Sequence, residues 1–237
     1  MDLEELLEFI DEMSIVPQDS SDVYIISHEI DATEEGLRYS LIVSSDDIIK
    51  RFLSEPKRDK VCFAFDHTYQ LVTEDIPVLM VGQLLQSGPY CPVLCVLQNK
   101  EDKGAFDFVL NFIKQKREVW PVAVMGDASK AFSASVKEQL PDAIRVVCWY
   151  HMIRAVRTRL QGIKSTNSTV YNNIMSDLYS VHYFVSDEEQ FSIVMALFSR
   201  KWVEEYEFFD QDLKYDVRKA VMYIMDTWVR DKSSNTW

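Results

Sequence analysis

The 237-residue sequence has few of the residues that several common kinds of site require. It holds six glycines, and neither G-x-G-x-x-G nor G-x-x-x-x-G-K-[ST] occurs, which argues against a glycine-rich nucleotide-binding loop. Four cysteines are too few for a disulfide scaffold in a chain of this length, so a reducing compartment is expected. No apolar run approaches the ~20 residues of a membrane-spanning helix, and the acidic start lacks the basic region of a signal peptide. We therefore expect a globular protein without a membrane partner.

Basic residues are also scarce. The chain has 25 Lys+Arg against 38 Asp+Glu, a formal net charge of −13, and such acidity weighs against nucleic-acid binding because phosphates favour a basic surface. The acids are concentrated near the start, since residues 1–60 hold 16 acids and 6 bases and so account for −10 of the −13. Residues 151–185 hold one acid and four bases. The net charge therefore does not exclude a nucleic-acid role for the part of the chain after residue 60.

An ordered series of strand and helix patterns makes up most of the sequence. Apolar residues at helical spacing predict helices, and short apolar or alternating runs predict strands. The predicted elements are, in order, helix 2–13, strands 23–30 and 37–43, a helix capped by Ser44 or Ser45 and ending at 53, strands 61–65, 78–83 and 93–97, helix 103–116, strand 122–125, helix 129–140, strand 144–147, a helix starting near 149, and helices 170–181, 187–206 and 210–231.

This order of elements predicts an α/β fold. Three consecutive strands followed by alternating helices and strands are typical of a mixed sheet flanked by helices, and the ribonuclease-H-like fold fits the order best. An all-helical insertion region follows this sheet. We expect three parts: an N-terminal lead-in of helix, two strands and helix (1–58), the ribonuclease-H-like core (59–165), and the helical region (166–237).

Two aspartates stand where polar residues are least expected. Asp66 ends the apolar strand 61–65, and Asp127 follows the apolar strand 122–125 after Gly126. A carboxylate at the end of a buried strand is costly to desolvate unless something compensates, and a divalent cation is a common compensation. If the two strands are parallel neighbours, both carboxylates emerge at one sheet edge and share a metal ion. The alternative is that each aspartate caps the turn or helix that follows it, as Asp127 would for the helix at 129–140.

Cys148 and His151 form a C-x-x-H at the start of a helix, where residues three apart share one face. This pair is compatible with metal binding, with a thiol–imidazole pair, or with simple packing. A Cys–His nucleophile would require an oxyanion hole and an orienting residue, and the sequence declares neither. A Cys₃His zinc site that adds Cys91 and Cys95 is a further alternative, although the Cys91–Cys95 segment is interrupted by Pro92 and lacks a zinc-knuckle spacing.

A cluster of basic residues follows this motif. Arg154, Arg157, Arg159 and Lys164 make a basic helix that is able to contact a phosphate backbone, and a solvated helix face is the alternative.

Four of these segments, taken in order and with their spacing, resemble the transposase domain of Mutator-like elements. The upstream segment Tyr39-Ser40-Leu41-Ile42-Val43-Ser44-Ser45 also resembles the lead-in of these proteins, and the all-helical continuation agrees. The four segments are Ala64-Phe65-Asp66-His67-Thr68-Tyr69, Val124-Met125-Gly126-Asp127-Ala128-Ser129-Lys130-Ala131, Leu140-Pro141-Asp142-Ala143 and Cys148-Trp149-Tyr150-His151.

The resemblance implies a ribonuclease-H-like core that cuts and joins DNA during transposition with Mg²⁺ or Mn²⁺. Asp66 and Asp127 would be the first two acids of the Asp-Asp-Glu triad, the metal ligands that activate water and then a DNA 3′-hydroxyl. Cys148 and His151 would be the family's C-x-x-H, with a role in shaping the site. The implied partner is DNA with transposon terminal repeats, and the implied location is the nucleus.

The sequence departs from the family at the third acid. In the family this glutamate lies beyond a helical insertion in a segment resembling Thr-Asn-Asn-x-x-Glu, whereas this sequence ends at Asp231-Lys232-Ser233-Ser234-Asn235-Thr236-Trp237. Glu204, Glu205 and Glu207 cluster late in the chain, but they lie on a predicted amphipathic helix and we do not assign them. The zinc-binding module that recognises DNA in the family is also missing from this sequence. We expect a truncated transposase domain that is catalytically inactive or nearly so.

There are two alternatives to a transposase domain. The chain fits a non-catalytic, domesticated protein-interaction module that keeps the ribonuclease-H-like fold. An unrelated α/β nucleotide- or metal-binding domain would require a phosphate loop that this sequence does not contain.

Overall fold

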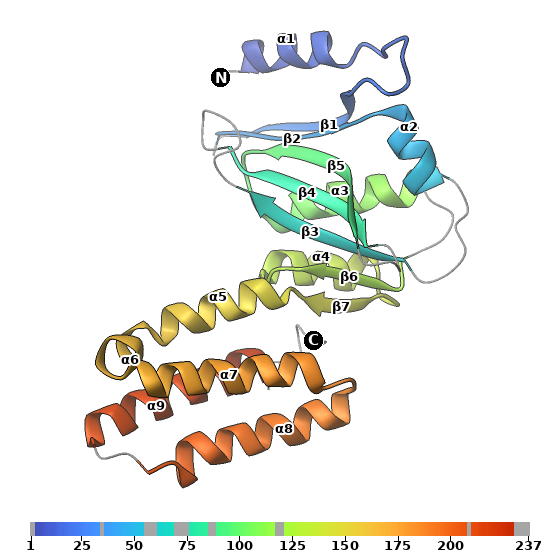
Figure 1. Cartoon of the computed structure of the whole chain (residues 1–237). Helices are drawn as coiled ribbons and strands as arrows, with labels where there is room; N and C mark the ends of the chain where they lie inside the picture. The colour runs from blue at the N-terminus through green and yellow to red at the C-terminus, as the bar shows by residue number, and fades with distance from the viewer. Residues whose placement is uncertain are drawn as a thin grey trace. The chain divides into compact units, whose positions relative to one another are not determined.

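The computed structural model describes residues 3–33, 36–54, 61–68, 76–84, 89–116, 121–207 and 210–229 (Figure 1). It divides into two units, Met1–Val146 and Val147–Trp237. Two parts of the sequence used above, Tyr69 and the segment 231–237, lie outside the described residues. None of the described helices is both long and apolar enough to cross a membrane.

The elements of the first unit follow the predicted order. Ser45 caps the helix after the second strand, because its hydroxyl accepts a hydrogen bond from the Ile48 amide at 3.4 Å. That helix is shorter than predicted and continues as a π-helical segment. The elements are α1 (Leu3–Met13), β1 (Tyr24–Thr33), β2 (Gly36–Ser44), α2 (Asp46–Ile49), η1 (Lys50–Ser54), β3 (Cys62–Thr68), β4 (Val78–Leu84), β5 (Tyr90–Gln98), α3 (Lys103–Lys116), β6 (Ala123–Gly126), α4 (Lys130–Gln139) and β7 (Ile144–Val147).

The seven strands form one mixed sheet in the order β1-β2-β5-β4-β3-β6-β7. β3 pairs antiparallel with β4 and parallel with β6, so the sheet changes direction beside its central strand. The order β5-β4-β3-β6-β7, three antiparallel strands followed by strands that come after crossover helices, is that of the ribonuclease-H-like fold. The prediction of a mixed sheet flanked by helices is confirmed.

The hairpin β1–β2 belongs to this same sheet. Its turn places Gly36 at a φ of +118°, a left-handed conformation that glycine adopts without strain. β2 then pairs antiparallel with β5 from Ser40 to Val43. The two strands of the predicted lead-in therefore extend the predicted core, while the three-part division by residue number stays a prediction.

Helices α3 and α4 cover one face of the sheet, and side-chain alternation explains which residues meet them. Phe63 and Phe65 of β3 face this side, where they join the apolar face of α3 in the main core. On the other face, Leu6 and Ile10 of α1 pack against Ile25 of β1 and neighbouring residues of β2. The strands that lead to Asp66 and Asp127, β3 and β6, therefore contribute buried side chains to the main core.

The second unit is helical throughout the residues described. Its largest buried side chain is Trp202, which is 1% exposed, stacks on Tyr206 and donates a hydrogen bond from Nε1 to Asp177 at 2.8 Å. Side-chain caps at Asn167, Asp187 and Asp210 mark three of the helix starts. The elements are α5 (Trp149–Arg159), α6 (Gln161–Thr166), α7 (Ser168–Phe184), α8 (Glu188–Arg200), η2 (Lys201–Glu205), α9 (Gln211–Ile224) and η3 (Met225–Val229).

Candidate functional site

Strand register brings Asp66 and Asp127 to matching positions. The parallel pair β3–β6 aligns Phe63 with Val124 and Ala64 with Met125, where the pairing ends. Continued for two more residues, this register would bring Asp66 opposite Asp127, which follows the end of β6 at Gly126. Neighbouring strands lie ~4.8 Å apart, and residues opposite one another in this pair present their side chains on the same face. Asp66 is exposed and Asp127 is half-buried. Because β3 and β6 are parallel neighbours, Asp66 near the end of β3 and Asp127 just after β6 lie toward the same edge of the sheet.

Gly126 holds β6 close to α4 just before Asp127. A Cβ at Gly126 would lie 2.4 Å from Cε1 of Phe132 and 3.2 Å from the Phe65 carbonyl oxygen. A side chain at Gly126 would therefore displace the Phe132 ring of α4. The residue that caps α4 is Ser129, whose hydroxyl accepts from the Phe132 amide at 3.3 Å. Asp127 accepts from the Ser129 amide at 3.0 Å and so stabilises the turn before the helix. A carboxylate has lone pairs left after one such bond, so this turn is compatible with metal ligation.

Arg145 of β7 supports the same turn from the neighbouring strand. Its guanidinium donates to the backbone carbonyl of Asp127 and also to that of Val146. The guanidinium also lies over the Phe132 ring, with Cζ 4.5 Å from the ring centroid. Arg145 thus fixes the backbone at Asp127.

Tyr90 of β5 lies against Gly82 of β4. A Cβ at Gly82 would lie 2.3 and 2.4 Å from two atoms of the Tyr90 ring, so the missing side chain of Gly82 makes room for that ring beside the strand that carries Asp66. Burial, together with the negative charge of Asp66, raises the pKa of Tyr90 to about 12. The hydroxyl therefore keeps its proton at neutral pH and is available as a hydrogen-bond donor.

His67 points to the opposite face from Asp66, as expected where a strand continues. Its side chain is 8% exposed, its ring edge meets Phe106 of α3, and its Nε2 lies 2.6 Å from the side-chain nitrogen of Gln98. With the amide donating to Nε2, the imidazole proton lies on Nδ1, 3.8 Å from Glu101. Burial lowers the pKa of His67 and outweighs the opposing effect of Glu101, Asp127 and Asp66.

The neutral His67 makes stability depend on pH. Because the pKa is lower in the folded protein than its ordinary 6.5, the unfolded chain binds the proton first as pH falls. We expect the free energy of unfolding to fall as pH drops below about 6.5, by less than about 1.4 kcal/mol per pH unit, the limit for one proton. Urea unfolding of wild type and His67→Gln between neutral and mildly acidic pH measures this. An equally steep decline in His67→Gln would contradict it.

The carboxylate pair suits a hard divalent cation. Mg²⁺ binds oxygen ligands and commonly takes one or two protein carboxylates, with water and substrate phosphates completing its shell. Among the described residues, no group of three or more His, Cys, Asp or Glu side chains is arranged to hold a metal ion. The chemistry of the two carboxylates, one exposed and one half-buried, fits Mg²⁺ or Mn²⁺ as ligands.

Cys148 and His151 lie at the start of α5, in the second unit. Cys148 is the N-cap residue, its carbonyl accepts from the Met152 amide at 3.2 Å, and both side chains are half-buried. All four cysteines are free thiols, Cys91 and Cys95 lying on β5 of the first unit. Neither unit by itself, in its described residues, brings together three His, Cys, Asp or Glu side chains able to hold a metal ion, and the Cys₃His zinc site stays an untested alternative. The shaping role given to the C-x-x-H stays a prediction.

The four basic residues lie on α5 and α6 with exposed side chains. Arg157 donates to the Tyr179 hydroxyl at 2.5 Å, and Arg159 lies over the Tyr223 ring at 5.4 Å. Lys164 lies 5.5 Å from the Tyr171 ring centroid. Aromatic rings of α7 and α9 therefore hold three of these cations in place, and Arg154 adds a fourth exposed charge.

Sequence reasoning missed Tyr90 and Arg145. Tyr90 stands three residues before the start of the predicted strand 93–97 and belongs to no motif, and Arg145 is one polar residue in a short strand. Their places depend on strand pairing, because Tyr90 lies against Gly82 of β4 and Arg145 reaches the Asp127 carbonyl from β7. Gly82 and Gly126 were the available signals, since isolated glycines in strands mark close approach of other groups.

Comparison with known proteins relates this chain to DDE transposases. Residues 77–190, just under half of the chain, match the family model of transposases of the ISL3 type. The matched segment contains Asp127, Cys148, His151 and the basic helix, and it begins after Asp66. Among solved structures, the chain is similar to the Drosophila P element transposase strand transfer complex, with 12% sequence identity, 98% of this chain and 68% of that chain covered, and a TM-score of 0.36. No curated protein matches in sequence.

Proposed function

We propose that the first unit carries the metal-binding part of a transposase centre that cleaves and joins DNA strands. The observation that supports this proposal is the parallel pairing of β3 with β6, the two strands that lead to Asp66 and Asp127. The match of residues 77–190 to transposases supports the same reaction class. The finer assignment to Mutator-like elements rests on the four ordered motifs, whereas the matched family model is of the ISL3 type.

In this proposal Asp66 and Asp127 would hold Mg²⁺ or Mn²⁺ through carboxylate oxygens. A bound divalent ion supplies Lewis-acid stabilisation of the phosphoryl transition state and lowers the pKa of a bound water or 3′-hydroxyl. The chain's own groups supply position: Arg145 and the Ser129 amide fix the Asp127 turn, and Tyr90 has a hydroxyl that stays protonated. A phosphodiester entering on the open side would meet Tyr90 as a hydrogen-bond donor.

The proposed centre has two acids rather than three. Among the described residues, no third metal-binding side chain accompanies Asp66 and Asp127. Glu204, Glu205 and Glu207 belong to the second unit, at and just after η2, and we leave them unassigned. We propose that these 237 residues bind the metal ion but cleave DNA weakly or not at all by themselves. Metal binding, rather than turnover, is then the measurable property of this chain.

DNA is the proposed partner, and the nucleus the proposed location, through the transposase relationship. In the second unit, α5 and α6 offer Arg154, Arg157, Arg159 and Lys164, exposed side chains that suit contacts to phosphate oxygens without reading sequence. From Trp149 to Ser176 the chain has no Asp or Glu, so this stretch is positively charged despite the acidic total.

Metal-directed backbone scission tests the proposal directly. Fe²⁺ takes the place of Mg²⁺ in many oxygen-ligand sites, and with ascorbate and peroxide it cuts the polypeptide close to where it is bound. We expect fragments whose new ends lie near Asp66 and near Asp127 and whose yield falls when Mg²⁺ competes. Cutting confined to other segments, or cutting that Mg²⁺ does not suppress, would reject the site. A nicking assay with Mn²⁺ on DNA carrying terminal repeats separately tests the low activity, and robust Asp66-dependent cleavage would contradict it.

A non-catalytic interaction module is the second candidate function. The observation that favours it is an exposed apolar groove in the second unit, which has no part in the carboxylate pair. The two functions are compatible in one chain, because they use different units.

A further inference from the structure

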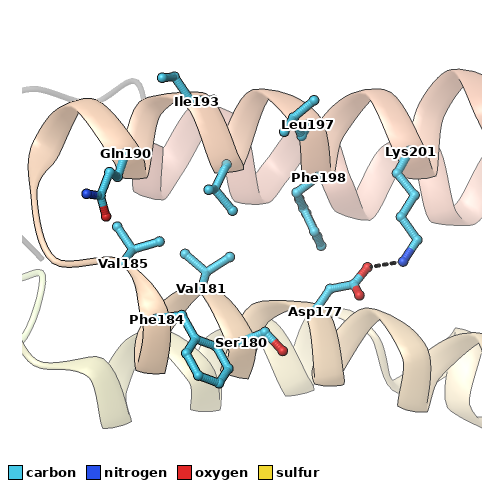
Figure 2. Close-up of a pocket in the computed structure, with 11 residues that line it drawn as sticks. Asp177, Ser180, Val181, Phe184, Val185, Gln190, Ile193, Leu197, Phe198 and Lys201 are labelled. Carbon is cyan, nitrogen blue, oxygen red and sulfur yellow. Dashed lines mark hydrogen bonds and ion pairs between the residues drawn. The ribbon is translucent and has the colours of Figure 1, made fainter.

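An apolar groove runs between α7 and α8 in the second unit, with a volume of about 460 Å³. Figure 2 shows Val181 and Val185 directed into the space from one side and Phe198 from the other. The Asp177–Lys201 ion pair, 2.7 Å long, closes one end of the groove. The groove is therefore an apolar channel with a polar end.

The rim of this groove exposes large apolar side chains. Phe184 at the end of α7 is 83% exposed, and Ile193 and Leu197 on α8 are 54% and 51% exposed. Tyr183, next to Phe184, is 75% exposed. Burying a side chain of this size is worth about 1.5–3 kcal/mol, so four of them on one small helical unit indicate a surface that another surface covers.

Charge is distributed along α8 so that the helix complements itself. Its first turn carries Glu188 and Glu189, and its end carries Arg200 and Lys201, with Ile193 and Leu197 exposed between them. When two copies of such a helix lie antiparallel, the acidic start of each faces the basic end of the other. A parallel pair would instead place like charges together, which is unfavourable.

We propose that the α7–α8 groove is a self-association surface that a second copy of this chain covers, with the two α8 helices antiparallel about a two-fold axis that crosses the exposed face of α8 midway between Ile193 and Leu197. In this register Ile193 meets the partner's Leu197, and Glu189 meets the partner's Lys201. Each contact occurs twice, once from each copy, because both residue pairs are centred on position 195 of the helix. One short helix therefore supplies an apolar centre and two flanking ion pairs, which is what an isologous interface requires.

Existing ion pairs do not prevent this arrangement. Lys201 contacts Asp177, and Arg200 contacts Glu205 at 2.7 Å, but both pairs are solvent-exposed. Exposed pairs contribute little to stability and rearrange readily, and a lysine ammonium has three N–H groups for more than one acceptor. Glu189 of a second copy is thus able to join Lys201 without breaking a buried contact.

Sedimentation velocity of the full chain over a wide range of protein concentration tests the proposal. We expect a reversible monomer–dimer equilibrium whose dissociation constant rises at least about tenfold in Leu197→Glu. Tyr215→Glu is the matched control, because Tyr215 is 65% exposed on α9 of the same unit but lies outside the groove, and its dissociation constant should stay near that of wild type. A chain that is monomeric throughout, or an equal effect of both variants, would overturn the proposal.

Cross-linking tests the antiparallel register independently of affinity. Ala196 and Ser186 are both exposed, and in this register two copies of residue 196 lie close to the two-fold axis, at the helix separation of ~8–10 Å. Two copies of residue 186 lie ~27 Å apart along the helix axes. A short bismaleimide should therefore cross-link Ala196→Cys above the wild-type background and leave Ser186→Cys at that background. The reverse pattern would overturn the register. None of these results depends on metal binding, so the proposal stands or fails separately from the transposase centre.

Discussion

Asp127→Asn is expected to weaken Mn²⁺ binding by at least about 100-fold, because removing groups that merely support a metal ligand already costs ~10–100-fold. The amide keeps the size of the side chain and its ability to accept from the Ser129 amide, so the turn before α4 is preserved. What it loses is the negative charge and one anionic oxygen donor. Mn²⁺ binding measured by electron paramagnetic resonance of the free ion reports this loss directly.

Asp66→Asn should cost a similar factor, and the double variant should cost little more than either single change. The two carboxylates act on one ion, so removing the first removes most of what the second contributes. Asp31→Asn is the matched control, since it removes an exposed acid of the same charge from β1 of the same unit. Independent, additive losses would indicate two separate weak sites. An equal loss in Asp31→Asn would show that the weaker Mn²⁺ binding comes from the change in net charge and not from a lost metal ligand.

Phe132→Ala is expected to destabilise the first unit by about 3–5 kcal/mol, the usual cost of removing a buried aromatic side chain. Phe132 is 1% exposed, and its ring centroid lies 4.9 Å from those of both Phe65 and Phe106. The change opens a cavity between the sheet and α4 and also removes the ring under the Arg145 guanidinium. Urea unfolding followed by far-ultraviolet circular dichroism, which reports on the backbone, measures the loss of stability.

Phe132→Leu serves as the control because it keeps most of the apolar volume. It should cost much less than Phe132→Ala, while it still loses the contact with Arg145. If the two variants were equally destabilised, the cation–π contact rather than the packed ring cluster would dominate the energy at this position. A loss well under 1 kcal/mol in Phe132→Ala would contradict the packing argument.

The sequence was informative wherever local pattern decides structure. Apolar periodicity predicted helices and strands close to their observed bounds, as at 103–116 and 144–147, because amphipathic faces and buried strands have distinct spacings. The condition set for Asp66 and Asp127, that their two strands are parallel neighbours, is met by β3 and β6, while the metal site that they would share stays a prediction. The predicted end of the strand at 61–65 was too early, because β3 continues to Thr68 through its pairing with β4.

The features that local sequence patterns did not predict depend on pairing between segments far apart in the chain. Nothing local in 23–43 indicates that this hairpin joins β5, and the union depends on hydrogen bonds between residues over fifty positions apart. Tyr90 and Arg145 acquire their places in the same way. The apolar groove was equally hidden, because Ile193 and Leu197 have the spacing of a buried helix face and only the packing of α7 against α8 leaves them outside.

The β3–β6 pairing also joins two segments that are far apart in the chain. Asp66 and Asp127 belong to parts of the polypeptide separated by the whole of β4, β5 and α3, and in the unfolded chain they meet only at the entropic cost of closing that long loop. A cation held by both carboxylates would bind the folded sheet and not the unfolded chain. By mass action, occupancy would then raise the melting temperature of the first unit, with the ion acting as a removable cross-link between its central strands.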